Sequence, residues 1–155
     1  MLKYLAPLVI SSLLISSSTP TSPMITSTDI LIQPITLQAR EELLLPAGQI
    51  FTSDRDKGFA TVLVQFENQR EQDKVITIES IEIQDSSNGR IYMNLQFPQT
   101  IHLRPLEHSA NDFHLTNKSG FSGRSPIKAV VTYQIDGMRE VLTSAPIEVN
   151  RTQPE

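Results

Sequence analysis

Apolar residues of this chain recur at every second position in short segments that turn residues separate, without a sustained i, i+3, i+4 pattern. The clearest segment is RIYMNLQF at 90–97, whose alternate apolar residues share one face: Ile91, Met93, Leu95 and Phe97. A period of two is that of a β-strand with one buried face. The pattern therefore predicts an all-β fold.

Two further segments refine this expectation. FATVLVQF at 59–66 is apolar on both parities, which is typical of a strand covered on both sides or near the centre of a sheet. The segment 127–135 alternates regularly and ends at Asp136 and Gly137, residues that accept the positive φ angles of a tight hairpin turn. We expect the chain to return along 139–149.

The segment VITIESIEIQ changes phase in its middle. Ile76 and Ile78 are even-numbered, whereas Ile81 and Ile83 are odd-numbered, so a regular strand cannot put all four on one face. Either a bulge near Glu79 or Ser80 restores the register, or the strand passes from one sheet to another. Both alternatives are typical of a β-sandwich.

The expected strands follow one another at the spacing of an immunoglobulin-like antiparallel β-sandwich of about seven to nine strands. DSSNG at 85–89 is expected to be a turn. The strands are predicted at 30–38, 59–66, 75–83, 90–97, 100–104, 112–116, 127–135 and 139–149, with a short ninth at 43–45.

The N-terminal residues predict export. A lysine followed by an apolar run from Leu5 to Ile15 has the layout of a signal peptide, and the run is shorter than the roughly 20 residues that a membrane span needs. We assign 1–18 to a signal peptide, 19–28 to a Ser/Thr/Pro-rich linker, 29–150 to one sandwich domain and 151–155 to a C-terminal tail. The expected location is periplasmic or extracellular, and contact with a membrane is expected only if the signal segment stays uncleaved.

Composition argues against several classes of function. The chain has no cysteine, which excludes disulfides, thiolate catalysis and thiolate metal ligands. Its net charge of −4 does not favour a broad surface for nucleic acid, and we expect no nucleic-acid partner. GxSxG, HExxH and glycine-rich phosphate-binding motifs are absent from the sequence. We therefore expect a protein that is not an enzyme and needs no cofactor.

All three histidines lie in one short stretch, at 102, 108 and 114. If 100–104 and 111–115 form a hairpin, His102 and His114 lie opposite each other on its outer face, about 5 Å apart at Cβ, and two imidazoles there suit zinc or copper. If the long connection instead arches between two sheets, the pair is separated. We interpret both as ordinary surface histidines and keep a metal site of His102 and His114 as the alternative.

The loop KSGFSGRSP at 118–126 is the expected contact surface. It combines Gly and Ser with the apolar side chain of Phe121 and the cation of Arg124, both expected to be exposed. Loops on rigid sandwiches often carry recognition, although a merely flexible connection has the same composition. Phe121 and Arg124 are the predicted partner-contact residues.

Four segments between residues 49 and 133 together resemble a family of bacterial exported proteins known only as a domain of unknown function. They are IFTSDRDKGF, VITIESIEIQDSSNGR, PQTIHLRPLEHSANDFHL and SGFSGRSPIKAVVTY. The loop departs from the family in having Arg124 and Pro126 where small residues are common. The resemblance implies a fold and an exported location, but no activity.

The resulting expectation is an exported interaction or envelope-associated domain that binds an unknown protein partner through an edge strand or through the Phe121 loop. The alternative is a periplasmic protein that binds copper or zinc through its histidines.

Overall fold

The computed structural model describes residues 29–43, 48, 50 and 54–151, which form β-strands and connecting turns without a helix. Within this part of the chain, no helix has the length and apolar character needed to cross a bilayer. The expected all-β fold is confirmed, and the strands form two sheets.

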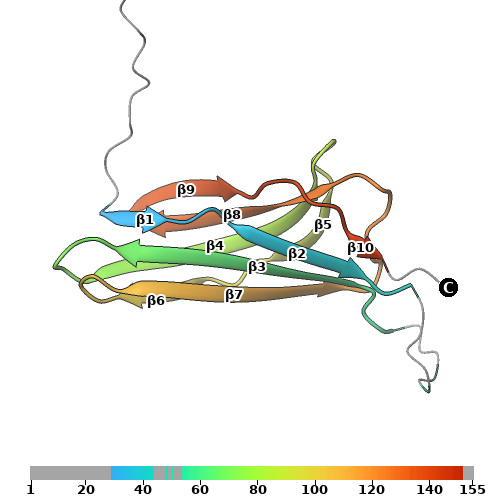
Figure 1. Ribbon diagram of the computed structural model, residues 1–155, viewed down its shortest axis with the longest axis horizontal. Helices are drawn as coiled ribbons and strands as arrows, with labels where there is room; N and C mark the ends of the chain where they lie inside the picture. The colour runs from blue at the N-terminus through green and yellow to red at the C-terminus, as the bar shows by residue number, and fades with distance from the viewer. Residues whose placement is uncertain (1–28, 44–47, 49, 51–53, 152–155) are drawn as a thin grey trace, which may run out of the picture.

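The first sheet, called sheet A, is centred on the long strand β3 (Figure 1). β1 and β2 pair with one side of β3, β7 pairs with its other side, and β10 lies parallel to the end of β2. The bounds of these strands are β1 (Ile30–Ile32), β2 (Thr36–Glu41), β3 (Gly58–Asn68), β7 (His108–Asn117) and β10 (Asn150–Arg151).

The second sheet, called sheet B, is centred on β4 and β8. β9 pairs with the outer side of β8, while β5 and β6 pair with successive parts of the outer side of β4. The bounds are β4 (Lys74–Asp85), β5 (Ile91–Leu95), β6 (Gln99–Leu103), β8 (Ile127–Ile135) and β9 (Met138–Thr143).

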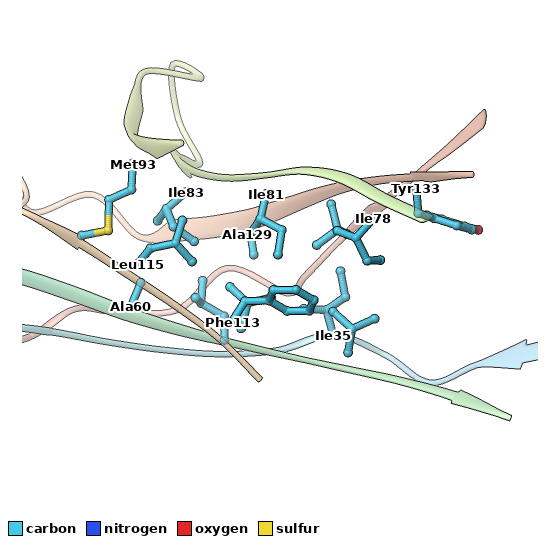
Figure 2. Packing of buried hydrophobic residues seen from close by; sticks show 14 of the residues in the cluster. Ile35, Ala60, Ile78, Ile81, Ile83, Met93, Phe113, Leu115, Ala129 and Tyr133 are labelled. Carbon is cyan, nitrogen blue, oxygen red and sulfur yellow. The ribbon is translucent and has the colours of Figure 1, made fainter. Parts of the chain in front are cut away.

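The core lies between the inner faces of the two sheets. Figure 2 shows Phe113 and Leu115 of sheet A facing the layer of Ile81, Ile83 and Ala129 from sheet B. Each fully buried aliphatic side chain of this kind contributes roughly 1.5–3 kcal/mol relative to an exposed one. In the absence of cysteine, this packing carries the stability of the fold.

The phase change in β4 is a bulge. Ile78 pairs with Tyr133 and Ser80 pairs with Thr132, so Glu79 is the extra residue in β4. The bulge lets all four isoleucines of the segment reach the core with 2% exposure or less. The prediction of a bulge near Glu79 or Ser80 is confirmed, and β4 stays in sheet B along its whole length.

The other confirmed elements include the centre of sheet A and the hairpin after β8. The buried residues of β3 alternate with half-buried ones, as expected of a strand with neighbours on both sides. Asp136 and Gly137 have φ angles of 49° and 80° and join β8 to β9 directly.

Two strand predictions are corrected, and one residue of the expected tail lies in a strand. The segment 30–38 is interrupted between β1 and β2, where Pro34 lacks an amide donor. β9 ends at Thr143, ahead of Pro146, so 139–149 is not one strand. Arg151, assigned to the tail, pairs with Glu41 in β10.

The expected buried face of 90–97 is confirmed at Met93 and in part at Leu95, which is half-buried and packs against the core, but it is wrong at Ile91 and Phe97. The register of β5 shifts at Tyr92, since Met93 pairs with Ile83 and Ile91 pairs with Gln84. Ile91 is 49% exposed and Phe97, beyond the end of the strand, is 74% exposed. For the short ninth strand, Leu43 is outside any strand and residues 44–45 lie outside the described part of the chain.

Candidate binding surface at the β7 edge

The Phe121 loop is fastened to the body of the sandwich. Phe121 is 4% exposed, its ring packs edge-on against Tyr92 with centroids 5.5 Å apart, and its amide donates to Oε1 of Glu41 over 2.8 Å. The expectation that Phe121 is exposed is wrong, because the loop folds back over the end of the core. Arg124 is exposed, as expected.

Glu41 holds this loop, and the sequence analysis missed it. Its Oε2 accepts from Nε of Arg151 over 2.9 Å, and Arg151 also donates to the carbonyl of Gly123 over 2.6 Å. Alternation along β2 from Leu37 through Ala39 to Glu41 would have placed the carboxylate on the inner face. Gly120, with φ of 68°, passes so close to Glu41 that a Cβ there would lie 2.0 Å from Oε1.

Asn117 completes this network at the end of β7. Its amide nitrogen donates to the carbonyls of Tyr92 and Gly120, and its Oδ1 accepts from the Gly120 amide over 2.7 Å. Main-chain groups of residues 120–123 thus bond to side chains of the sandwich body, which fastens the loop across its end. Of the two predicted contact residues, only Arg124 lies at the surface.

The structure does not bring the predicted metal pair together. His102 lies in β6, beside Val75 of sheet B, whereas His114 lies in β7, beside Thr61 of sheet A. The connection between β6 and β7 therefore arches from one sheet to the other, and the supposed hairpin is not formed. In the described part of the chain, no group of three or more His, Asp or Glu side chains is placed to hold a metal ion.

Two ionisable groups with shifted pKa values lie at the turn after β4 and in the interior strand β8. Hydrogen bonds from the hydroxyl and amide of Ser87 hold the pKa of Asp85 below its ordinary value. Burial raises the pKa of Tyr133, and its hydrogen bond to Glu140 raises it further.

A groove with a volume of about 400 Å³ lies on the β2 side of sheet A. The guanidinium of Arg40 lies 4.6 Å from the centre of the Phe59 ring, and Glu148 supplies the carboxylate of the groove.

The strand edges offer a clearer binding feature. Most edge strands of the described chain are short, and several are bounded by proline: β6 has five residues between Pro98 and Pro105, and β9 has six and is followed by Pro146. β5 carries a bulge. Such devices prevent an edge from pairing with another chain.

β7 lacks every one of these devices. It has ten residues, HSANDFHLTN, without lysine or proline, and it pairs with β3 in unbroken register along its whole length (Figure 1). Among the described residues, no strand pairs with its other side. β7 is therefore the longest open edge of the described molecule.

The alternation of hydrogen-bonded pairs between β3 and β7 shows which main-chain groups of β7 point away from β3. The amide of Asn68 donates to the carbonyl of Glu107 over 2.8 Å, one step along the same ladder. Because antiparallel pairs alternate, odd-numbered residues of β7 bond to β3, and even-numbered residues direct amide and carbonyl groups to the free edge. These residues are His108, Ala110, Asp112, His114 and Thr116, whose side chains are all exposed.

Comparisons with known proteins add only weak structural likeness. The X-ray structure of Northeast Structural Genomics Consortium target SoR45 is 12% identical, with a TM-score of 0.46 over 79% of this chain and 87% of that chain. A b-glucosidase, EmGH1 from Erythrobacter marinus, is 16% identical, with a TM-score of 0.40 over 77% of this chain and 15% of that chain. No protein-family model and no curated protein matches the chain. The fold is therefore described by its own strand pairings.

Proposed function

We propose that this chain is an exported, non-enzymatic interaction domain that binds a protein partner by accepting one of its strands on the free edge of β7. The observation that carries the proposal is the open ladder of β7, which offers the amides and carbonyls of alternate residues over ten positions. An added strand gains main-chain hydrogen bonds there, each contributing roughly 0.5–1.5 kcal/mol net.

We also propose that the two sheets have an immunoglobulin-like topology. β3 pairs with β7, while β4 pairs with β8 and β8 with β9. This arrangement is similar to the B–E and C–F–G pairings of an immunoglobulin-like sandwich and supports that topology. Domains of this architecture commonly serve adhesion and assembly, and the proposed compartment, periplasmic or extracellular, derives from the N-terminal sequence pattern alone.

Site-specific photo-crosslinking in the exporting host tests the proposal. A small diazirine amino acid replaces Thr116, which is exposed at the β7 edge, or Thr100, which is exposed on the outer face of sheet B and serves as the control position. We expect an adduct of defined mass from position 116 and none of that mass from position 100.

Ala110→Pro supplies the matched variant. The Ala110 amide points to the free edge, so proline there removes a donor from the edge without removing a bond to β3. The adduct from position 116 should disappear in this background while the thermal midpoint of the protein stays close to that of the parent. Equal adducts from positions 116 and 100, or an adduct that survives Ala110→Pro, would contradict strand addition at β7.

A further inference from the structure

The open edge of β7 is complementary to itself. We infer that the strand added to β7 is β7 of a second copy of this chain, antiparallel to the first, with Asp112 of each copy opposite His114 of the other. The inference rests on the proposed function, because it names the partner that the open edge receives.

Backbone phase limits the possible registers. Since the even-numbered residues of β7 carry the outward amides and carbonyls, an antiparallel second copy must place even residues opposite even residues. A two-fold axis at Asp112 would put two carboxylates opposite each other, and an axis at His114 would pair the two imidazoles. An axis at Ala110 would place Asp112 opposite His108, but the two strands would then overlap only over residues 108–112. An axis at Phe113 also gives two Asp–His pairs, with Asp112 opposite His114, and lets the strands overlap over residues 109–117.

The side chains suit this register. Nδ1 of His114 lies 3.1 Å from Oγ1 of Thr61, and when Nδ1 accepts from that hydroxyl the ring proton is on Nε2, which can donate to a carboxylate. Directly opposite residues of an antiparallel pair lie about 4.5–5.5 Å apart at Cβ, which is within reach of such a hydrogen bond. The flanking pair is Ala110 with Thr116, two side chains without charge.

A second observation points to the same side of the molecule. Phe97 is 74% exposed and lies in the link between β5 and β6, the two strands on the outer side of β4. β5 is the neighbour of β7 in the opposite sheet, where the Asn117 amide donates to the Tyr92 carbonyl over 3.0 Å. An exposed aromatic ring on the side that carries the open edge is typical of an association surface.

Exchanging Asp112 and His114, singly and together, tests the register. In Asp112→His, two imidazoles oppose each other, and in His114→Asp two carboxylates do, whereas the double variant restores both complementary pairs in inverted order. By sedimentation equilibrium of the purified protein, we expect concentration-dependent dimerisation, an increase of about tenfold or more in the dimer dissociation constant for each single variant, and recovery in the double variant.

The remaining outcomes separate this inference from the proposed function. Both residues are exposed, so unchanged thermal midpoints should show that the single variants fold. A protein that stays monomeric at all concentrations, or a dimer unaffected by either single variant, would overturn the inference. If the purified protein is monomeric while position 116 crosslinks to a different protein and Ala110→Pro abolishes that adduct, the second copy is excluded as partner but strand addition stands. If the purified protein is monomeric and position 116 gives no specific adduct, both the second copy as partner and strand addition at β7 are contradicted.

Discussion

Glu41 shows how much of this fold depends on single polar side chains. Its carboxylate is buried, and it joins three segments that are remote in sequence: β2, the loop at Phe121 and the C-terminal strand β10. A buried donor that loses its acceptor costs about 1–3 kcal/mol. Loop closure and C-terminal strand pairing therefore depend on one carboxylate.

Replacement of Glu41 by Ala should lower the free energy of unfolding by about 2 kcal/mol or more, because the Phe121 amide and the Arg151 guanidinium lose their common acceptor. Urea unfolding followed by circular dichroism measures the change. Glu42→Ala is the control: Glu42 is half-buried and pairs with Arg40 and, at 3.9 Å, with Arg55, so its removal should cost less than that of the buried Glu41. Equal losses in the two variants would show that the Glu41 network is not stabilising.

Asp85 makes the stability of the turn after β4 depend on pH. Hydrogen bonds from Ser87 and Tyr92 hold its pKa below the ordinary value of 3.8. A carboxyl group whose pKa is lower in the folded state stabilises the fold above its unfolded pKa, and this contribution is lost as the pH falls through the folded value. The stabilising effect should therefore be present at neutral pH and disappear in strong acid.

We expect Asp85→Asn to lower the thermal midpoint at neutral pH, and the difference from the parent protein to shrink as the pH falls below about 4. Thermal unfolding measured at intervals from pH 7 to pH 2 tests this. Asp54→Asn, whose side chain is 83% exposed, should change the midpoint little at any pH. A difference that is constant with pH would mean that the charge of Asp85 is not the stabilising feature.

Alternation predicts burial well for the interior strand β8 and poorly for the edge strand β5. β8 lies between β4 and β9, and every second residue from Ile127 to Ile135 is buried. β5 lies at an edge, where a bulge at Tyr92 turns Ile91 outward and the ring of Tyr92 toward Phe121. An edge strand has one neighbour, so its register is less constrained than that of an interior strand.

Replacement of Val131 by Asp should abolish soluble, cooperative folding, because Val131 is fully buried in β8 and an unpaired carboxylate would enter the core. Met93→Asp should do the same at the buried position of β5. Val141→Asp in β9 is the control: Val141 is 59% exposed, and this variant should remain soluble. Solubility and a cooperative thermal transition are the readouts, and a folded Val131→Asp protein would contradict the observed strand parity.

In the molecule as a whole, the connection from β6 to β7 passes from one sheet to the other and separates the two histidines. The arch places β6 in sheet B and β7 in sheet A, so His102 and His114 face solvent from different sheets. Isothermal titration with zinc or copper should therefore show the same affinity for the parent protein and for a His102→Ala/His114→Ala variant. Stoichiometric binding that the double variant loses would show that the pair does bind a metal ion.

The predicted signal peptide concerns the residues ahead of the described domain. Mass spectrometry of the protein exported from its host should find an N-terminus between about Ser17 and Asp29, because the short apolar run favours cleavage over membrane retention. Recovery of the chain with Met1 intact would remove the cleaved-signal assignment and leave an anchored protein.

Local patterns in the sequence were enough to predict the all-β class, the phase change in β4 and the hairpin after β8, while they left open whether β4 has a bulge or passes between the sheets. Each of these follows from local rules: alternate residues face opposite sides of a strand, one extra residue reverses the phase, and Asp–Gly accepts positive φ. Four further properties come from the tertiary arrangement. Phe121 is buried, Glu41 has partners from the loop and the C-terminal strand, the histidines are apart, and β7 has a free edge among the described strands. These properties depend on which strands become neighbours. That choice joins residues far apart in the chain, such as Glu41 with Arg151, and no local pattern encodes it.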